Sequence, residues 1–385
     1  MTPDDQISEL EEQAYAADRR EQQRQAAFLY EQARRLAIDD GQAARAFSIG
    51  VRTAECWSNA ADHRRALTVL LELLYDIPGT ADPWDVYQAK YLNFWYQLYD
   101  KENPDLDELT ACAEELDGLC TALGQPDSGD IPYRAAELLH EQGRWAEALT
   151  QFEIAWSRQP ARGPDSGFVA SKAAAAALRL ARRADAQRWL THITSDDRPD
   201  DARIRAAYVR LAIALYDNNA PAARAALLGV DDAMQGVERP HYSAQLTRMV
   251  VAALVLDETF GDPLALSHPA GQRLAEFPES QLSIPWFASF WHSCTMIHQI
   301  AGLRYAAGVK PVDDIFYRKP HKLRPRSAAW FHEDLPGRVT AARRACDDAT
   351  PVAVLLDNSF RCSYRQQEIN AMRGRIDEIA AVHNI

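Results

Sequence analysis

The sequence predicts an all-α protein built as an α-solenoid of helical hairpins, with a divergent helical cap at its C-terminal end. Within residues 1–260, apolar residues recur at spacings of three and four, the period of one helix face. Short Gly, Pro, Asp and Asn turns separate these stretches, and clear strand-like alternation is absent. The helical stretches also recur with a period near 40 residues, which indicates stacked units.

Length and composition favour a soluble chain with a large core. The chain has 385 residues, of which 47% are hydrophobic and 25% charged, so wholesale disorder is excluded. No apolar run is long enough for a membrane helix and the first residues are acidic and polar, so we expect no membrane association and a cytoplasmic location. The six cysteines have no paired spacing, which favours reduced thiols over disulfides or zinc.

The segment ELLHEQGRWAEALTQFEIAWSRQP, residues 137–160, shows the hairpin most clearly. A glycine turn is followed by a helix with aromatic and small residues on one face and then by a proline: Gly143, Trp145, Ala148, Phe152, Ala155 and Pro160. Small residues let helices approach closely, the aromatic fills the gap, and proline cannot continue a helix. These six positions match a known 34-residue pattern, and the segment resembles a tetratricopeptide repeat (TPR).

Weaker units fall in register with this one. Their marker is the small residue of the second helix: Ala26, Ala66, Ala148, Ala186 and Ala223. The long gap between Ala66 and Ala148 holds one more predicted pair, at about 83–99 and 105–123. The turn glycine is replaced by Glu21 and Ala61 in the first two units, so the repeats are degenerate. The resemblance implies a right-handed solenoid over residues 1–239.

The period fades over residues 240–385, which we expect to form a divergent helical region. Helices are predicted at 241–257, 264–276, 285–307 and 338–348, followed by a stretch, PVAVLLDNSF, that fits helix or strand. Ile369, Met372, Ile376 and Ile379 form one stripe of a final helix. Residues 308–337 form a long, basic, Pro-rich segment, and loops of that size are usually functional or disordered.

The resemblance implies that the first helices of successive units line a concave groove that binds ligands. The repeat register places eleven candidate residues there: Glu55, Asn59, Tyr133, Glu137, His140, Glu141, Arg179, Arg182, Arg205, Tyr208 and Asn219. Mixed Tyr, Arg, Asn and carboxylate side chains suit a protein or peptide partner, whose backbone they can hydrogen-bond. The alternative is that these are ordinary solvated positions.

Residues 84–99 hold seven aromatic side chains. Five of them, Trp84, Tyr87, Tyr91, Phe94 and Trp95, share a helical stripe and are predicted to form a packing seam. Tyr96 and Tyr99 lie off the centre of that stripe and are candidates to face a partner.

A basic segment lies inside the Pro-rich stretch. It contains Arg318, Lys319, Lys322, Arg324 and Arg326, and residues 301–345 carry ten Lys and Arg against four acids, although the whole chain has a net charge of −13. Three interpretations stay open for it: a nucleic-acid contact, which the negative net charge disfavours, a contact with an acidic partner or with the acidic repeats, and a solvated loop.

Signatures of cofactor and catalytic sites are absent from the sequence. It contains no GxxxxGK[ST], GxGxxG, HExxH or GxSxG pattern, so we expect no cofactor. His292, Cys294 and His298 invite a metal hypothesis, but on a helix His292 and Cys294 lie about 200° apart and cannot converge on one ion. We therefore expect no metal.

These observations predict a non-enzymatic adaptor or regulatory subunit that holds a partner protein or peptide in the solenoid groove. A ligand- or peptide-responsive sensor is the alternative. A nucleic-acid binder or an enzyme built on the C-terminal third is the third hypothesis. The sequence leaves the oligomeric state open.

Overall fold

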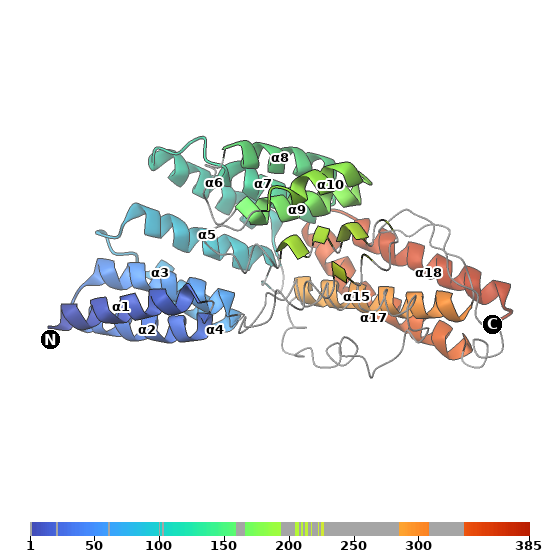
Figure 1. The fold of residues 1–385 in the computed structure, drawn as a ribbon, viewed down its shortest axis with the longest axis horizontal. Helices are drawn as coiled ribbons and strands as arrows, with labels where there is room; N and C mark the ends of the chain where they lie inside the picture. The colour runs from blue at the N-terminus through green and yellow to red at the C-terminus, as the bar shows by residue number, and fades with distance from the viewer. Residues whose placement is uncertain are drawn as a thin grey trace. The chain divides into compact units, whose positions relative to one another are not determined.

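The computed structural model describes residues 2–20, 22–60, 62–99, 101, 104–158, 166–193, 285–307 and 335–385, with isolated positions between 205 and 226. Over this part of the chain the regular structure is helical and contains no strand (Figure 1). The prediction of an all-α protein is therefore confirmed. No described helix is both long enough and apolar enough to cross a membrane.

The first helices follow one another with short turns. They are α1 (Pro3–Asp18), α2 (Gln23–Asp39), α3 (Ala43–Asn59), α4 (His63–Tyr75), α5 (Pro83–Tyr99) and α6 (Leu106–Ala122). Consecutive helices contact each other from α1 through α6. The pair predicted in the long gap between Ala66 and Ala148 is present as α5 and α6.

The remaining described helices are α7 (Asp130–Glu141), α8 (Trp145–Arg158), α9 (Ser166–Arg179), α10 (Arg183–Leu190), α15 (Pro285–Ala306), α17 (Leu335–Ser359) and α18 (Tyr364–Val382). Helix α8 contacts α9, α9 contacts α10, and α17 contacts both α15 and α18. The helices predicted at 241–257 and 264–276 lie outside the described residues.

Contacts within the chain divide it into two compact units. The first holds α1 to α6, and the second holds α7 to α10 together with α15, α17 and α18. The C-terminal helices thus share a unit with α7 to α10. The domain boundary predicted near residue 240 lies outside the described residues and stays a prediction.

Local signals explain where several helices begin. Thr2 and Asp5 form a reciprocal capping box at the start of α1, with Pro3 at its first position. Asp105 accepts hydrogen bonds from the backbone N–H groups of Asp107 and Glu108 and caps α6. These polar side chains satisfy backbone donors that have no partner inside the helix.

Several helices end with the same backbone hydrogen bond, in which an N–H donates to the carbonyl five residues earlier. In the first unit these bonds reach the carbonyls of Ala17, Ala37 and Trp57, at 3.0, 2.8 and 2.9 Å. The three positions are 20 residues apart, so a pair of helices occupies 40 residues, as the repeat period predicts. Among the described residues, five further donors close later helices in this way: Gln125, Arg144, Arg182, Cys362 and Ile385.

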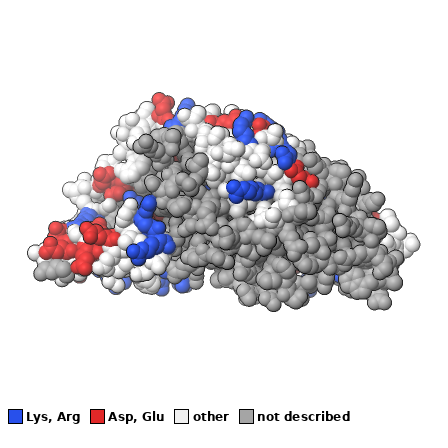
Figure 2. Space-filling model, in the orientation of Figure 1, with Lys and Arg blue, Asp and Glu red and all other residues white. Residues whose placement is uncertain are grey.

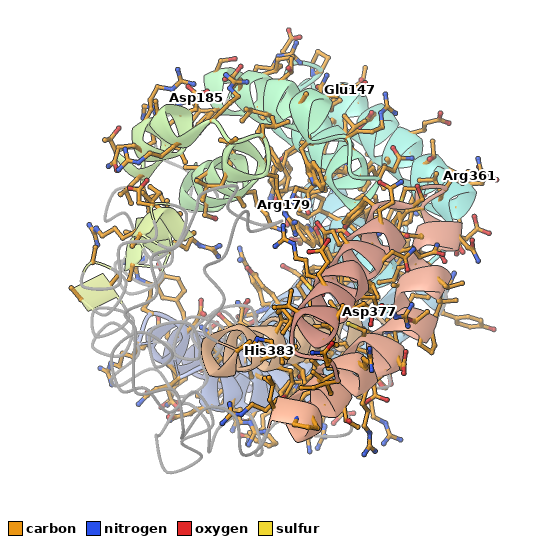
Figure 3. The ribbon with its side chains drawn as sticks, turned by 90° about the vertical axis from the view of Figure 1, so that its right-hand side faces the viewer. Glu147, Arg179, Asp185, Arg361, Asp377 and His383 are labelled. Carbon is orange, nitrogen blue, oxygen red and sulfur yellow. The ribbon has the colours of Figure 1, made fainter. Side chains whose placement is uncertain are left out.

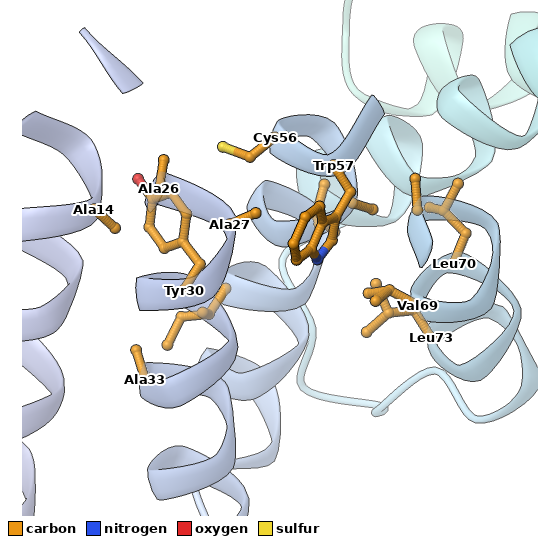
Figure 4. Packing of buried hydrophobic residues seen from close by; sticks show 14 of the residues in the cluster. Ala14, Ala26, Ala27, Tyr30, Ala33, Cys56, Trp57, Val69, Leu70 and Leu73 are labelled. Atoms are coloured by element: carbon orange, nitrogen blue, oxygen red, sulfur yellow. The ribbon is translucent and has the colours of Figure 1, made fainter. Parts of the chain in front are cut away.

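The core of the first unit is built around small residues. The predicted markers Ala26 and Ala66 are fully buried, as are Ala148 and Ala186 in the second unit. Ala223 lies outside the described residues. Figure 4 shows Ala26 and Trp57 in the buried cluster of the first unit, whose larger members fill the space that the alanines leave.

Two predictions for the C-terminal helices have different outcomes. The stripe of Ile369, Met372, Ile376 and Ile379 is buried as expected and packs with residues of α15 and α17. The stretch PVAVLLDNSF, which fitted helix or strand, is helical, because the helix predicted at 338–348 continues as α17 to Ser359 with Pro351 in its interior. Apolar burial of Ala349, Ala353 and Leu356 on one face holds the helix together across the proline.

The aromatic helix α5 also corrects the sequence analysis. Tyr87 and Phe94 are buried as the packing seam requires, but Trp84 is exposed at the start of the helix. Tyr96 and Tyr99, which were candidates to face a partner, are buried. The buried sector is therefore wider than a single stripe, because α5 contacts α3 and α4 as well as α6.

Candidate interaction sites

The predicted groove residues of the first unit lie on α3. Glu55 and Asn59 are half-buried, and Glu55 accepts a hydrogen bond of 3.3 Å from Arg52 one turn earlier. Of the candidates near residue 210, Arg205 is half-buried, while Tyr208 and Asn219 lie outside the described residues. Partner binding by these residues stays a prediction.

The predicted groove residues of α7 are largely enclosed by the chain itself. Tyr133, Glu137 and Glu141 are buried, and His140 is half-buried. Lys172 of α9 places its Nζ 3.5 Å from Oε2 of Glu137. The surface that the register assigned to a partner is therefore covered here by other parts of the second unit.

Arg365, the second residue of α18, covers the end of α7. Its Nη2 donates to Oε2 of Glu141 at 2.6 Å, and its Nη1 donates to the Glu141 carbonyl at 3.2 Å and to Asp357 at 3.3 Å. Asp357 also accepts a hydrogen bond from the backbone N–H of Gln366 at 3.0 Å and so caps α18 from the end of α17. These buried charges join residues more than 200 positions apart in the sequence.

Aromatic side chains also pack where the α7–α8 turn meets the start of α18. Gly143 has a positive φ of 73°, and a Cβ at this position would lie 2.6 Å from the Tyr364 ring, so the α7–α8 turn fits closely over that side chain. Trp145 packs edge-on against the same ring. Arg179, where α9 approaches α18 in Figure 3, donates to Glu368 at 2.6 Å.

The pKa values of the two buried glutamates, Glu141 and Glu137, are shifted in opposite directions. Burial alone would raise the pKa of Glu141, but His140, whose Nδ1 lies 3.6 Å away, and the charge of Arg365 outweigh it and lower this pKa to about 2. Burial raises the pKa of Glu137, and Lys172 opposes this only in part. Glu141 is thus a stable carboxylate inside the protein, whereas Glu137 is costly to ionise.

Arg182 differs from the other candidates of the second unit because its side chain is exposed. It pairs with Asp185, which is labelled in Figure 3, one turn later. An exposed pair of this kind contributes little to stability.

The basic segment with Arg318, Lys319, Lys322, Arg324 and Arg326 lies outside the described residues. On the face drawn in Figure 2, acidic and basic side chains occur together over the described helices. The three interpretations of the basic segment stay open, because its residues lie outside the described part of the chain.

A solvent-open groove of about 610 Å³ lies between α2 and α4 in the first unit. It is lined by Phe28, Glu31, Arg34, Arg35, Ile38, Arg65, Thr68, Val69 and Glu72. Two of these apolar side chains are strongly exposed, Phe28 by 47% and Ile38 by 54%. Exposed apolar groups gathered in one concave place are typical of binding sites.

Trp57 of α3 joins the two walls of this groove. The Phe28 ring packs edge-on against the Trp57 ring with centroids 5.0 Å apart, and the indole N–H donates to Glu31 at 2.9 Å. The guanidinium of Arg65 lies 4.6 Å from the Trp57 ring centroid and 5.4 Å from that of Phe28. Stacking on two rings fixes where the positive charge of Arg65 lies.

Arg34 links α2 to α4 near the C-terminal end of α2. Its Nη1 donates to Glu72 of α4 at 3.0 Å, which links the two helices. Gly50 of α3 makes this close packing possible, because a Cβ there would lie 2.7 Å from Leu73 and 3.1 Å from Nε of Arg34. The groove therefore has a rigid base built from three helices.

Sequence reasoning missed this groove because the repeat register assigned α2 and α4 to the second, outer position of each hairpin. A signal was present on α2. Phe28, Arg35 and Ile38 share one helix face, opposite the buried face of Ala26 and Ala33. Two large apolar residues on the face away from the alanines indicate a second contact surface.

Two observations on the described residues concern metal ligands and thiols. They contain no group of three or more His, Cys, Asp or Glu side chains placed to hold a metal ion. Burial raises the pKa of Cys346 to about 11 and that of Cys362 to about 12, so neither thiol is a ready nucleophile at neutral pH.

No protein-family model matches this chain, and no curated protein matches it.

Proposed function

We propose that this chain is a non-enzymatic, cytoplasmic interaction protein of TPR-like helical repeats, which acts as an adaptor or regulatory subunit by holding a segment of a partner protein. The observation that carries the proposal is the groove between α2 and α4, with Phe28 and Ile38 exposed over a fixed base. A rigid apolar groove lowers the entropy lost when a partner segment binds.

The repeat character of the proposal rests on two regularities. The helix-closing carbonyls of Ala17, Ala37 and Trp57 are evenly spaced, and the marker alanines of the described units are buried. Both are expected of stacked hairpins, which present extended grooves to partners.

Site-specific photo-cross-linking in the full chain tests the proposal. A photo-reactive amino acid replaces Ile38 at the groove, and in a matched control it replaces Val382, which is 73% exposed on α18. We expect one protein to be cross-linked from position 38 but not from position 382. The purified partner should then bind the unmodified chain, and Phe28→Ser should weaken that binding at least tenfold.

A different result would reject the proposal. If no protein is captured from position 38, or if the same proteins are captured equally from both positions, the groove is not a docking surface.

A further inference from the structure

The groove between α2 and α4 carries an imbalance of charge. Its lining holds three arginines and two glutamates, in a chain whose net charge is −13. The lining therefore carries a formal charge of +1 although the protein is acidic.

Both glutamates of the lining already accept hydrogen bonds from side chains of the protein. Glu31 accepts the indole N–H of Trp57, and Glu72 accepts a hydrogen bond from Arg34. A basic ligand would have to compete for these carboxylates with Trp57 and Arg34.

Two arginines of the lining, in contrast, pair with no carboxylate of the lining. Arg35 is exposed, and the described residues provide it with no ion-pair partner. Arg65 is oriented by the rings of Phe28 and Trp57 and by an ion pair of its Nε with Asp62 at 3.6 Å, and its side chain stays 51% exposed. Guanidinium groups held in this way bind carboxylates.

We propose that this groove takes a short acidic segment of a partner protein, whose apolar side chains pack on Phe28 and Ile38 and whose carboxylates pair with Arg35 and Arg65. This inference rests on the proposed function and adds the chemistry of the partner. Apolar contact supplies affinity, and the arginines select against basic and neutral segments.

Fluorescence anisotropy with three labelled peptides tests the inference on the full chain. The first is a short peptide of Glu, Asp, Leu and Phe, and the second has Gln and Asn in place of its acids. The third is residues 316–327 of this chain, FYRKPHKLRPRS, which tests whether the basic segment occupies the groove. We expect the acidic peptide to bind about tenfold more tightly than the neutral one, and the basic peptide to bind most weakly.

Variants locate the binding. Arg35→Glu should weaken the acidic peptide about tenfold and leave the neutral peptide unchanged. Arg20→Glu, a matched exposed arginine outside the groove lining, should change neither by more than about twofold. Phe28→Ser should weaken both peptides, and circular dichroism checks that each variant keeps its helix content.

Several outcomes would overturn the inference. Equal binding of acidic and neutral peptides, tighter binding of the basic peptide, or no binding of the acidic peptide would each contradict the acidic-partner chemistry. Self-association that Phe28→Ser abolishes would assign the groove to a second copy of the chain. In these cases a partner cross-linked from position 38 would still support the groove as a docking surface, so the two proposals fail separately.

Discussion

Arg365 is almost enclosed by protein, and its charge is balanced by Glu141 on α7 and Asp357 on α17. Breaking one side of a buried ion pair leaves an uncompensated charge, whereas removing both sides often costs little. We therefore expect strong coupling between these residues.

A double-mutant cycle in urea unfolding measures this coupling. Glu141→Gln and Arg365→Met should each lower the free energy of unfolding by about 3–5 kcal/mol. The double variant should lose clearly less than the sum of the two. Additive losses would show that the two side chains do not act as a pair.

The same pair predicts a dependence on pH. The folded-state pKa of Glu141 is about 2, below the ordinary value of 4.5, so the stability it contributes is present above pH 4.5 and is lost as the pH falls toward 2. The difference in unfolding free energy between the wild type and Glu141→Gln should shrink over that range. If this difference in unfolding free energy stays constant from pH 7 to pH 2, the pKa of Glu141 is not lowered by folding.

Glu137→Gln is the contrasting variant. Burial raises the pKa of Glu137 in the folded state, so its contribution to stability is present at low pH and is lost as the pH rises through that raised pKa. Replacement by neutral glutamine should therefore become more favourable to the folded state as the pH rises. Unfolding free energies of the wild type and of Glu137→Gln at several pH values test this. If the variant gains stability relative to the wild type as the pH falls, the prediction is wrong.

Gly143 and Gly124 both have a φ of 73°, but only Gly143 has a close neighbour where a Cβ would lie. Gly124→Ala should cost about 1 kcal/mol of unfolding free energy, from the left-handed backbone alone. Gly143→Ala should cost about 2–4 kcal/mol, because Tyr364 must also move. Equal losses in chemical denaturation would show that the contact with Tyr364 contributes nothing.

At the scale of the element, helix α17 contains a proline that the burial of its neighbours overcomes. Pro351 is exposed, so Pro351→Ala loses little packing and restores a backbone N–H. We expect the variant to be more stable by about 1–3 kcal/mol. Pro336→Ala, at the second residue of the same helix, should change stability little because that N–H has no partner within the helix. Loss of stability in Pro351→Ala would mean that the proline is needed for packing.

Helix positions were predictable from apolar spacing and turn residues, as α5, α6, α8 and α15 show. Which face of each helix is buried was less predictable. On α5 a single stripe was expected to be buried, but Tyr96 and Tyr99 are buried as well, because neighbours contact the helix on more than one side. Spacing within one helix does not reveal how many helices surround it.

At the scale of the whole molecule, the repeat pattern predicts local pairing but not contacts between distant segments. No pattern in the sequence links Glu141 to Arg365, which are 224 residues apart, or Arg179 to Glu368. The C-terminal helices were expected to form a divergent cap. In the structure, α18 instead contacts Glu141 of α7 and Arg179 of α9, which the repeat register had assigned to partner binding.

The groove between α2 and α4 escaped prediction for a related reason. The resemblance to TPR units directed attention to the first helix of each hairpin, whereas the exposed apolar side chains lie on the second helices. Which face of a repeat stays open depends on packing between units, and a degenerate repeat pattern does not specify it.

The central claim is that Arg35 meets the carboxylates of a bound acidic segment, and a charge exchange tests it most directly. The affinities of the wild type and of Arg35→Glu are measured for the acidic peptide and for the same peptide with Lys in place of one acid at a time. The account predicts that at least one lysine substitution weakens binding to the wild type and restores binding to Arg35→Glu. If no lysine substitution restores binding to that variant, Arg35 does not contact the segment and the account is contradicted.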